Sequence, residues 1–190
     1  MSTEFKTDGF TEKATIMDSA AVGRAITRIS HEILERHKGC KHIVLVGIRR
    51  RGVPMAERIS KRMTEIEGGE TVPNYALDIT FYRDDLTKVS ASPVINNDDL
   101  TTADVDGKHV IIVDDVIYTG RTVRAAIEAI FRHGRPKTVE LAVMIDRGLR
   151  ELPLRPDYVG KNIPTSRSEV VSVKLSEIDG IDSVSILATR

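Results

Sequence analysis

The sequence predicts an α/β fold in which a twisted parallel sheet is flanked by helices. Residues 43–48 and 110–113 are continuous apolar runs, IVLVGI and VIIV, as expected for strands that are buried on both faces. Each run is followed by charged residues and then by an apolar pattern with helical period. Strands and helices that alternate in this way form parallel sheets, and a further buried strand is expected at residues 139–145.

The composition is that of one ordinary globular domain. The 190 residues are 41% hydrophobic and 29% charged, which suits one α/β domain with an appendage. Because 28 basic residues balance 28 acidic residues, bulk charge does not indicate a nucleic-acid or membrane partner, and a polyanion site must come from local clustering. The single cysteine, Cys40, excludes an internal disulfide framework and a cysteine-rich metal site.

The N-terminal residues predict neither a secretory signal nor a membrane anchor. Charges are interspersed through residues 1–17, and no apolar run anywhere approaches the roughly 18 residues of a membrane span. We therefore expect a cytoplasmic protein without a membrane partner. Residues 1–17 are expected to be a flexible segment, of which 14–17 could add a short edge strand.

A first helix is expected from the Asp18-Ser19 N-cap to a C-cap at Gly39. Its apolar stripe consists of Val22, Ile26, Ile29 and Ile33. At about 100° per residue, the opposite face carries Arg24, Thr27, His31 and Lys38. That face is basic, and its ordinary interpretation is a solvated helix surface.

A diphosphate-binding loop is expected directly after the strand at 43–48. Residues 49–52, Arg-Arg-Arg-Gly, place positive charge at the ligand edge of the sheet, and a helix is expected at 55–66. The spacing of Gly47 and Gly52 superficially matches a P-loop. However, Val53 and Pro54 stand where a P-loop needs Lys and Ser or Thr, so that interpretation is rejected.

Residues 83–107 are predicted to form a lid. A third strand is expected at 75–82, and the next recognisable strand begins only at His109. A gap of this length is usually a lid or a disordered loop. Arg83, Asp84 and Asp85 at its base, beside the sheet edge, favour a lid that excludes water from a bound reactant. The tail, 149–190, is expected to form a small hood subdomain with N-terminal contributions, which leaves about 18–148 as the core.

The most informative stretch is Val110–Thr122, VIIVDDVIYTGRT. Asp114 and Asp115 follow a buried strand at the edge where open α/β sheets bind ligands. The turn at 119–122 opens a helix that runs to about residue 132, so its N–H groups and hydroxyls can hold a phosphate. Since the acid pair can accept hydrogen bonds from two vicinal hydroxyls, a 5-phosphorylated ribose fits both halves. The alternative without a ligand is a buried strand whose two acids cap the helix.

This thirteen-residue pattern resembles the phosphoribosyl diphosphate (PRPP) motif of type I phosphoribosyltransferases. Over almost its whole length the chain resembles one family, the bacterial bifunctional pyrimidine operon attenuation proteins and uracil phosphoribosyltransferases (PyrR type). The matching segments are ITRISHEILER from Ile26, VGIRRRGV from Val46, LDITFYRDDL from Leu77, VDDVIYTGRTVRA from Val113 and LAVMIDRGLRELPLRPDYVGKNIPTSRSE from Leu141.

The resemblance implies a type I phosphoribosyltransferase fold with a hood and a flexible lid, and assembly into homodimers or higher even-numbered oligomers. It implies the reaction of uracil with PRPP to give UMP and diphosphate, with Mg²⁺ required. It also implies that the protein, when charged with UMP or UTP, binds the leader of pyrimidine operon mRNA and promotes transcription termination.

The motifs and the resemblance together imply five groups of site residues. The ribose and 5-phosphate of PRPP are expected at Asp114, Asp115, Val116, Tyr118, Thr119, Gly120, Arg121 and Thr122. The diphosphate is expected at Arg49, Arg50, Arg51 and Gly52. Catalytic roles are expected for Asp114, Asp115, Arg83, Asp146 and Arg147, with Mg²⁺ held mostly through the substrate and by Asp114 and Asp146. The uracil pocket is expected at main-chain groups near Met144, Ile145, Val159, Gly160, Lys161 and Asn162. The RNA contacts of the family correspond to Thr27, His31, Arg36, Arg150 and Lys161.

Two alternatives stay open at this point. One is an RNA-binding regulator with vestigial transferase activity, and the other is a transferase for hypoxanthine, guanine or orotate, which the family-specific hood segments disfavour. Two positions depart from the family pattern: Arg50 stands where the loop often has Thr, and Leu149 stands where His is expected. No side chain is identified as the base for uracil N1.

Overall fold

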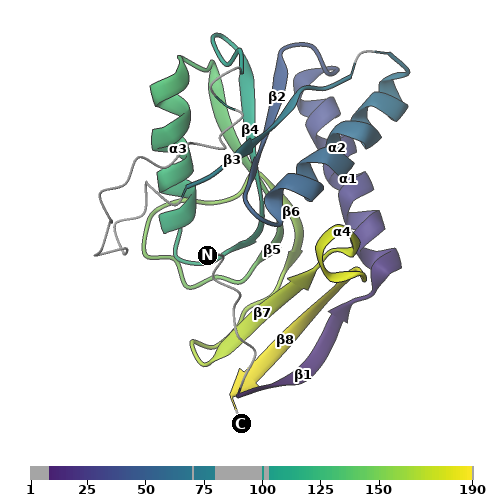
Figure 1. Cartoon of the computed structure of the whole chain (residues 1–190), viewed down its shortest axis with the longest axis vertical. Helices are drawn as coiled ribbons and strands as arrows, with labels where there is room; N and C mark the ends of the chain where they lie inside the picture. The colour runs from purple at the N-terminus through teal and green to yellow at the C-terminus, as the bar shows by residue number, and fades with distance from the viewer. Residues whose placement is uncertain (1–8, 70, 80–99, 101–102, 190) are drawn as a thin grey trace.

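The computed structural model describes residues 9–69, 71–79, 100 and 103–189. Within them the chain runs through strands and helices in the order shown in Figure 1. These elements are β1 (Phe10–Met17), α1 (Ser19–His37), β2 (Ile43–Ile48), α2 (Gly52–Glu67), β3 (Asn74–Leu77), β4 (His109–Ile117), α3 (Arg121–His133), β5 (Thr138–Asp146), β6 (Tyr158–Asn162), β7 (Glu169–Lys174), α4 (Ser176–Asp179) and β8 (Ser183–Thr189).

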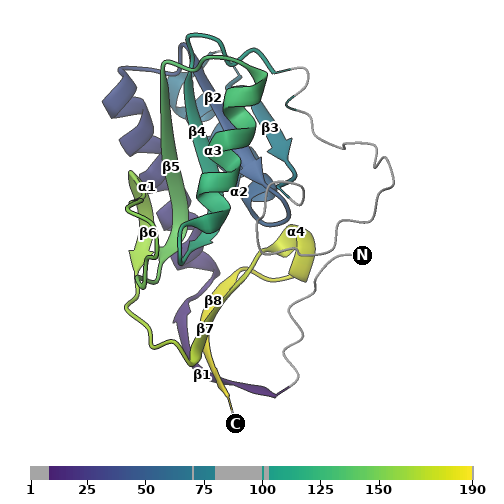
Figure 2. The ribbon, with the colours of Figure 1, turned by 90° about the vertical axis from the view of Figure 1, so that its left-hand side faces the viewer.

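A five-stranded parallel sheet in the order β3-β2-β4-β5-β6 forms the centre of the described structure. Helix α3 lies on one face of this sheet, and α1 and α2 lie on the other (Figure 2). Because successive residues of a strand point to opposite faces, Leu45 and Ile111 pack with α1 and α2, whereas Val44 and Ile112 pack with α3. Both faces are therefore covered, which explains the continuous apolar runs in the sequence.

The helix ends follow local sequence signals. The Asp18 side chain caps α1 by accepting a hydrogen bond from the Ala21 N–H at 2.7 Å. The same helix closes at Lys38, whose φ of 55° is left-handed, immediately before Gly39. Helix α2 begins at Gly52 rather than at the predicted Met55.

A second, antiparallel sheet in the order β1-β8-β7, together with α4, forms the hood. It lies beyond one end of the main sheet, with α4 on the side that faces the main sheet (Figure 1). Four apolar hood side chains continue the core cluster of the α1 and α2 face: Met17, Val173, Leu175 and Val184. The hood is thus attached through a shared hydrophobic core.

Two predicted boundaries are corrected by these sheets. Residues 10–17 of the segment expected to be flexible form β1, which pairs with β8 along its length, because the extended backbone gains a ladder of hydrogen bonds there. Residues 158–162, assigned to the hood from sequence, form β6 and pair with β5 in the main sheet. The short strand-like segments of residues 149–190 did not indicate which of the two sheets each would join.

The predicted lid falls mostly outside the described residues, as does Arg83. Its described end belongs to the core, because Leu100 and Val105 are each 1% exposed and pack with α3. The third strand is also shorter than expected, since β3 ends at Leu77 and the described residues stop at Ile79 before resuming at Leu100. In the described part of the chain, no helix combines the length and the apolar character needed to cross a bilayer.

Candidate active site

The ends of three neighbouring strands bring the predicted site residues to one edge of the main sheet. Loop 49–52 follows β2, the acid pair Asp114 and Asp115 lies near the end of β4, and Asp146 is the last residue of β5. Since β2, β4 and β5 are parallel neighbours, these groups share the carboxyl edge, where Ile117 is aligned with Asp146. The sheet therefore assembles the predicted site from segments far apart in the sequence.

Asp114 is buried at this edge, and Asp115 is half-buried. The Asp115 N–H donates to Asp114 Oδ1 at 2.9 Å, and the Val116 N–H donates to Asp115 Oδ1 at 2.9 Å. Burial, and then the charge of Asp115, raises the pKa of Asp114 well above its ordinary value. Burial also raises the pKa of Asp115, although the hydrogen bond with Asp114 and the charge of Arg51 oppose this shift. A diol or a cation at this point would relieve the pair by supplying donors or positive charge.

The loop after β2 packs tightly against β4 immediately before the acid pair. A Cβ atom at Gly52 would lie 2.2 Å from the Val113 carbonyl oxygen, and one at Gly47 would lie 2.6 Å from the Gly52 carbonyl oxygen. The spacing of these glycines, which resembles a P-loop in sequence, is therefore explained by close backbone packing. This packing holds the arginine-rich loop beside Asp114.

The three arginines of the loop differ in their surroundings. Arg49 and Arg50 are exposed and are joined by a cis peptide bond. The Arg51 guanidinium pairs with Asp179 of the hood, with Nη2 at 2.9 Å from Oδ1 and Nε at 3.3 Å from Oδ2. Arg51 also acts electrostatically on Asp115, so it links the acid pair to the hood. Asp179 was missed in the sequence, where the short acidic run 177–182 gave no signal of a partner.

The N-terminus of α3 forms the predicted phosphate loop. Gly120, with a left-handed φ of 94°, is its N-cap, and no side-chain hydrogen bond caps the helix. Its first-turn N–H groups also lack intrahelical acceptors, which suits an anion. Residues 151–154 lie over the Cα side of Gly120, where an added Cβ would be 3.4 Å from Leu152 Cβ.

The overlying segment is held to the loop by its own contacts. Thr119 O accepts from the N–H groups of Glu151 and Leu152, at 3.0 and 3.1 Å. Arg121 Nη2 pairs with Glu151 at 2.7 Å. Tyr118 and Thr122 are half-buried, so the loop is anchored on one side and partly accessible.

Asp146 is engaged by two protein donors rather than left open for a metal. Its Oδ2 pairs with Arg150 Nη2 at 2.5 Å, and its Oδ1 accepts from the Gly148 N–H at 2.9 Å. Arg150 also donates to the carbonyl oxygens of Leu154 and Tyr118, at 3.0 and 2.9 Å. These contacts bear on two predictions. The guanidinium of Arg150 pairs with Asp146, which is predicted to hold Mg²⁺, and the charge of Arg150, which is predicted to contact RNA, is paired within the fold.

Arg147 likewise connects the main sheet to the hood through hydrogen bonds. It is 6% exposed, and its guanidinium donates to Thr165 Oγ1, Ser166 O and Glu169 O at 2.8 to 2.9 Å. The same guanidinium lies 4.3 Å from the centre of the Tyr118 ring. These contacts hold Arg147, which is predicted to flank the leaving group, inside the fold.

The residues predicted to bind uracil lie on the neighbouring strands β5 and β6. Met144 and Ile145 are buried, whereas Lys161 and Asn162 are exposed. A Cβ at Gly160 would lie 2.5 Å from the Met144 carbonyl oxygen, so only glycine lets β6 approach β5 this closely. The pairs Ile145 with Lys161 and Asp146 with Asn162 bring this segment to the acid edge of the sheet.

The expected RNA contacts on α1 and β6 differ in exposure. Arg28 of α1 donates to Val159 O at 3.0 Å and to Gly160 O at 2.5 Å, so this side of α1 lies beside β6. His31 of α1 and Lys161 of β6 are exposed, and Thr27 of α1 is half-buried. Arg36, also exposed, lies nearer the opposite end of the sheet and pairs with Asp157 at 3.1 Å.

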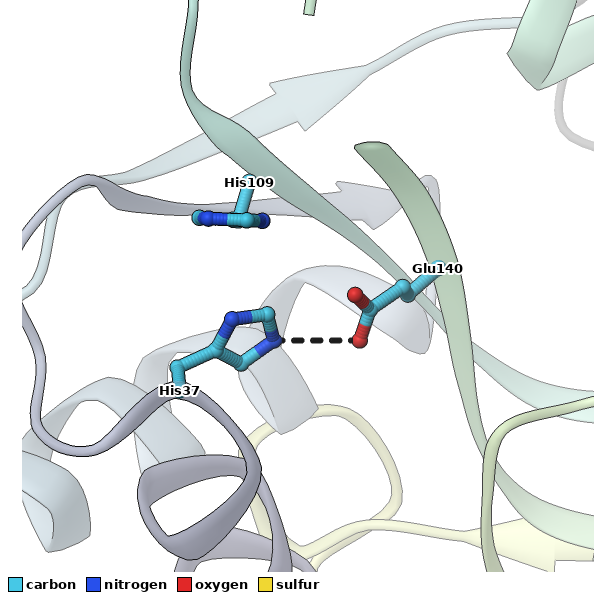
Figure 3. A group of neighbouring side chains, drawn as sticks. All are labelled: His37, His109 and Glu140. Carbon is cyan, nitrogen blue, oxygen red and sulfur yellow. Dashed lines mark hydrogen bonds and ion pairs between the residues drawn. The ribbon is translucent and has the colours of Figure 1, made fainter. Parts of the chain in front are cut away.

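A cluster at the opposite edge of the sheet was missed in the sequence. His37 of α1, His109 at the start of β4 and Glu140 of β5 point toward one another (Figure 3), with their ligand-type atoms within 4.8 Å. Glu140 Oε2 accepts from Tyr158 at 2.6 Å and lies 3.1 Å from His37 Nε2, while Oε1 accepts from Thr138 at 3.2 Å. Both carboxylate oxygens thus have protein donors, and we interpret the cluster as a hydrogen-bond network that ties the end of α1 to the sheet. Its members are separated by at least 30 residues, so no local motif indicated it.

The comparisons with known proteins place most of the chain in one family. Residues 13–178 match the phosphoribosyl transferase domain family. The chain is similar to the bifunctional protein PyrR of Pelotomaculum thermopropionicum, with 60% identity over 94% of this chain and 97% of the relative. It is 59% identical to the bifunctional protein PyrR of Clostridioides difficile, over 92% of this chain and 98% of the relative.

Solved structures show the same fold at much lower identity. A hypoxanthine-guanine phosphoribosyltransferase of Bacillus anthracis has a TM-score of 0.69 and 18% identity, over 95% of this chain and 99% of that chain. The hypoxanthine phosphoribosyltransferase of Trypanosoma cruzi has a TM-score of 0.68 and 17% identity, over 94% of this chain and 98% of that chain. The predicted type I phosphoribosyltransferase fold is thereby confirmed. The chain belongs to the phosphoribosyltransferase family and, within it, to the bifunctional PyrR proteins.

Proposed function

We propose that the protein transfers the phosphoribosyl group of PRPP to uracil, and that it binds pyrimidine operon leader RNA in response to uridine nucleotides. The observation that most strongly supports the transferase activity is the arrangement at the end of β4. There an acid pair, the buried Asp114 and the half-buried Asp115, is followed directly by the N-terminus of α3, which has no side-chain cap. A sugar that carries a diol and a phosphate matches both features.

In this proposal the residues of the chain act by binding and positioning. Asp114 and Asp115 accept hydrogen bonds from the two ribose hydroxyls, and their charge stabilises positive charge that develops on the ring. The first-turn N–H groups of α3 and the hydroxyls of Thr119 and Thr122 hold the 5-phosphate. Arg51 and the backbone of loop 49–52 receive the diphosphate as the bond from C1 to its oxygen breaks, the bond to uracil N1 forms and the N1 proton passes to water.

The acid pair fits Mg²⁺, whereas Asp146 does not. The raised pKa values of Asp114 and Asp115 mark a place that lacks positive charge. Carboxylate oxygens next to substrate phosphates are the surroundings that Mg²⁺ prefers. When bound, Mg²⁺ neutralises the diphosphate and makes it a better leaving group. Asp114 would hold the ion mostly through the substrate, and Asp146 is not included because Arg150 already pairs with it.

Substitution of Asp115 by Asn tests the ribose assignment. The variant removes one diol acceptor, so uracil-dependent release of diphosphate from PRPP is expected to fall about a hundredfold or more. Glu65→Gln is the control, because Glu65 is an exposed acid in the last turn of α2, outside the acid edge of the sheet. Near-normal activity of Asp115→Asn would contradict the assignment. The same assay with hypoxanthine, guanine and orotate separates uracil from the other bases.

Accessible residues on α1 and β6 support the second activity. His31 and Lys161 are exposed, Thr27 is half-buried, and Arg28 joins α1 to β6. We expect a Thr27→Ala, His31→Ala double variant to bind pyrimidine leader RNA at least about tenfold more weakly in a gel shift with UMP. Unchanged affinity would show that the RNA contacts lie elsewhere. If the parent protein binds RNA but lacks transferase activity, the alternative of a regulator with vestigial catalysis is favoured.

We also propose a homodimer or a higher even-numbered oligomer. This follows from membership of the family alone, and light scattering on the purified protein measures it directly. A monomer at micromolar concentration would contradict it.

A further inference from the structure

We propose that Asp179 of the hood is a positioning residue for the transferase reaction, because it orients the Arg51 guanidinium for diphosphate. The inference rests on the proposed function, in which loop 49–52 receives the diphosphate. It assigns part of the diphosphate site to the hood, which otherwise contributes only packing.

The geometry of the ion pair leaves one edge of Arg51 available. Asp179 engages the side of the guanidinium, where Nε and Nη2 lie 3.3 and 2.9 Å from its two oxygens. The second Nη2 hydrogen and both Nη1 hydrogens make no hydrogen bond to the described residues. A guanidinium has two usable edges, so Arg51 can hold Asp179 with one and a phosphate with the other. Asp179 is thus a support for Arg51 and not a competitor of the diphosphate.

Asp179 is itself held in place. Its Oδ2 accepts a hydrogen bond from the Leu175 N–H at 2.9 Å, across the short helix α4. Leu175 is fully buried in the core cluster that the hood shares with α1 and α2. The Asp179 carboxylate is therefore fixed to the core, and it can fix a long side chain that would otherwise sample many rotamers.

Docking of the hood does not require the pair of Arg51 and Asp179. Arg58 of α2 binds the same region through Asp182, with Nη1 2.9 Å from Oδ2 and Nη2 2.8 Å from Oδ1. It also donates to Glu177 Oε1 at 2.7 Å. Arg58 therefore already attaches the hood to α2. The role that remains for Asp179 is to orient the Arg51 guanidinium.

The placement matters because Arg51 is a long side chain at the N-cap of α2, beside the expected diphosphate. Its ion pair with Asp179, at 2.9 Å, fixes one edge of the guanidinium, so the other edge keeps one orientation. Asp179 therefore keeps the positive charge available for the leaving diphosphate.

Asp182 provides a matched control within the same loop. Asp182 accepts hydrogen bonds from Arg58 of α2 and from the Ser176 N–H, the latter at 2.7 Å. Asp179 likewise accepts from one arginine, Arg51, and from one backbone N–H, that of Leu175. Asp179→Asn and Asp182→Asn each remove one charge and keep an oxygen for the backbone donor. Only the first touches Arg51, so general loosening of the hood and loss of positioning can be separated.

The experiment measures KM for PRPP, KM for uracil and kcat for four proteins: the parent, Asp179→Asn, Asp182→Asn and Arg51→Ala. We expect Asp179→Asn to raise KM for PRPP about five- to twentyfold with KM for uracil unchanged, because lost preorganisation weakens diphosphate binding. Asp182→Asn is expected to lower the melting temperature with KM for PRPP unchanged. Asp179→Glu, which keeps the charge, should recover at least part of the PRPP affinity.

A double variant decides whether Asp179 acts through Arg51. Asp179→Asn added to Arg51→Ala should raise KM for PRPP no further, because the group it positions is gone. Equal effects of Asp179→Asn and Asp182→Asn, or additive effects with Arg51→Ala, would overturn the inference. If Arg51→Ala itself leaves KM for PRPP unchanged, the assignment of Arg51 to diphosphate fails, and the inference fails with it. Should Asp179→Asn not fold, Asp179→Ser, which can still accept from Leu175, takes its place in every comparison.

Discussion

The backbone N–H of Asp115 donates to Asp114 Oδ1 across 2.9 Å, so the buried Asp114 carboxylate accepts from the next residue, whose own carboxylate is half-buried. Such a pair is costly in the free protein, because burial and mutual repulsion both disfavour the charged forms. The hydroxyls of a substrate, or a cation, would offset this unfavourable free energy on binding. Its size in the free protein can be measured.

Asp114→Asn should stabilise the protein at neutral pH while it abolishes transfer. A group whose pKa is raised on folding contributes stability below its ordinary pKa, here 3.8, and loses it as pH rises through the higher folded value. Replacement of the charge should therefore raise the free energy of unfolding by about 0.5 to 2 kcal/mol at pH 7. Urea denaturation at pH 7 and pH 4 measures this. A gain in stability that is equal at both pH values would contradict the electrostatic explanation.

Acidification should destabilise the network of Glu140 and His109 in two steps. Burial, with the charges of His37 and Lys137, lowers the pKa of His109 from 6.5. Burial alone would raise the pKa of Glu140, but hydrogen bonds from Tyr158 and His37 and the charge of Arg36 lower it from 4.5. Both groups bind fewer protons when folded, so stability falls as pH drops below 6.5 and again below 4.5.

Two variants assign these steps. His109→Asn should remove the loss of stability between pH 7 and pH 5, and Glu140→Gln should cost about 1.5 to 3 kcal/mol at pH 7, the scale of hydrogen bonds to a charged group. Melting temperatures measured at closely spaced pH values provide the test. A His109→Asn profile that follows the parent would show that another group titrates there.

Gly52→Ala should destabilise the protein and weaken PRPP binding. Its Cβ would lie 2.2 Å from Val113 O, so loop 49–52 must move away from β4 at an expected cost of about 1 to 3 kcal/mol. Gly23→Ala in α1 is the control, because nothing lies within 4 Å of its Cβ. There alanine should stabilise by about 0.5 to 1 kcal/mol. If the two variants have similar melting temperatures, the close packing of this loop is not what glycine provides.

Lys161→Ala and Arg150→Ala should affect RNA binding for different reasons. Lys161 is exposed, so its loss should weaken binding to leader RNA, reduce the slope of log K against log salt by about 1 and leave the melting temperature unchanged. Arg150 is tied to Asp146 and to carbonyl oxygens. Its loss should lower the melting temperature. A direct RNA role for Arg150 would instead appear as a reduced salt slope in a fully stable variant.

Much of the fold was predictable because its signals are local. The continuous run at 43–48 indicated β2 with its observed bounds, and Asp18 indicated the start of α1. The chemistry of the candidate site was equally local, since the acid pair and the turn at Gly120 lie in one stretch of sequence. The strand order then places loop 49–52 beside them by the general rule for parallel sheets.

What only the tertiary structure decided are the partners of the charged side chains. Arg147 and Arg150, which the sequence placed in the catalytic and RNA sites, are used inside the fold, and Arg51 found its partner in the hood. Residues 10–17 and 158–162 joined different sheets because a strand pairs with whatever edge the fold leaves open beside it. A carboxylate or guanidinium gains its energy from a partner within a few ångströms, and that distance depends on the whole chain rather than on the neighbouring residues.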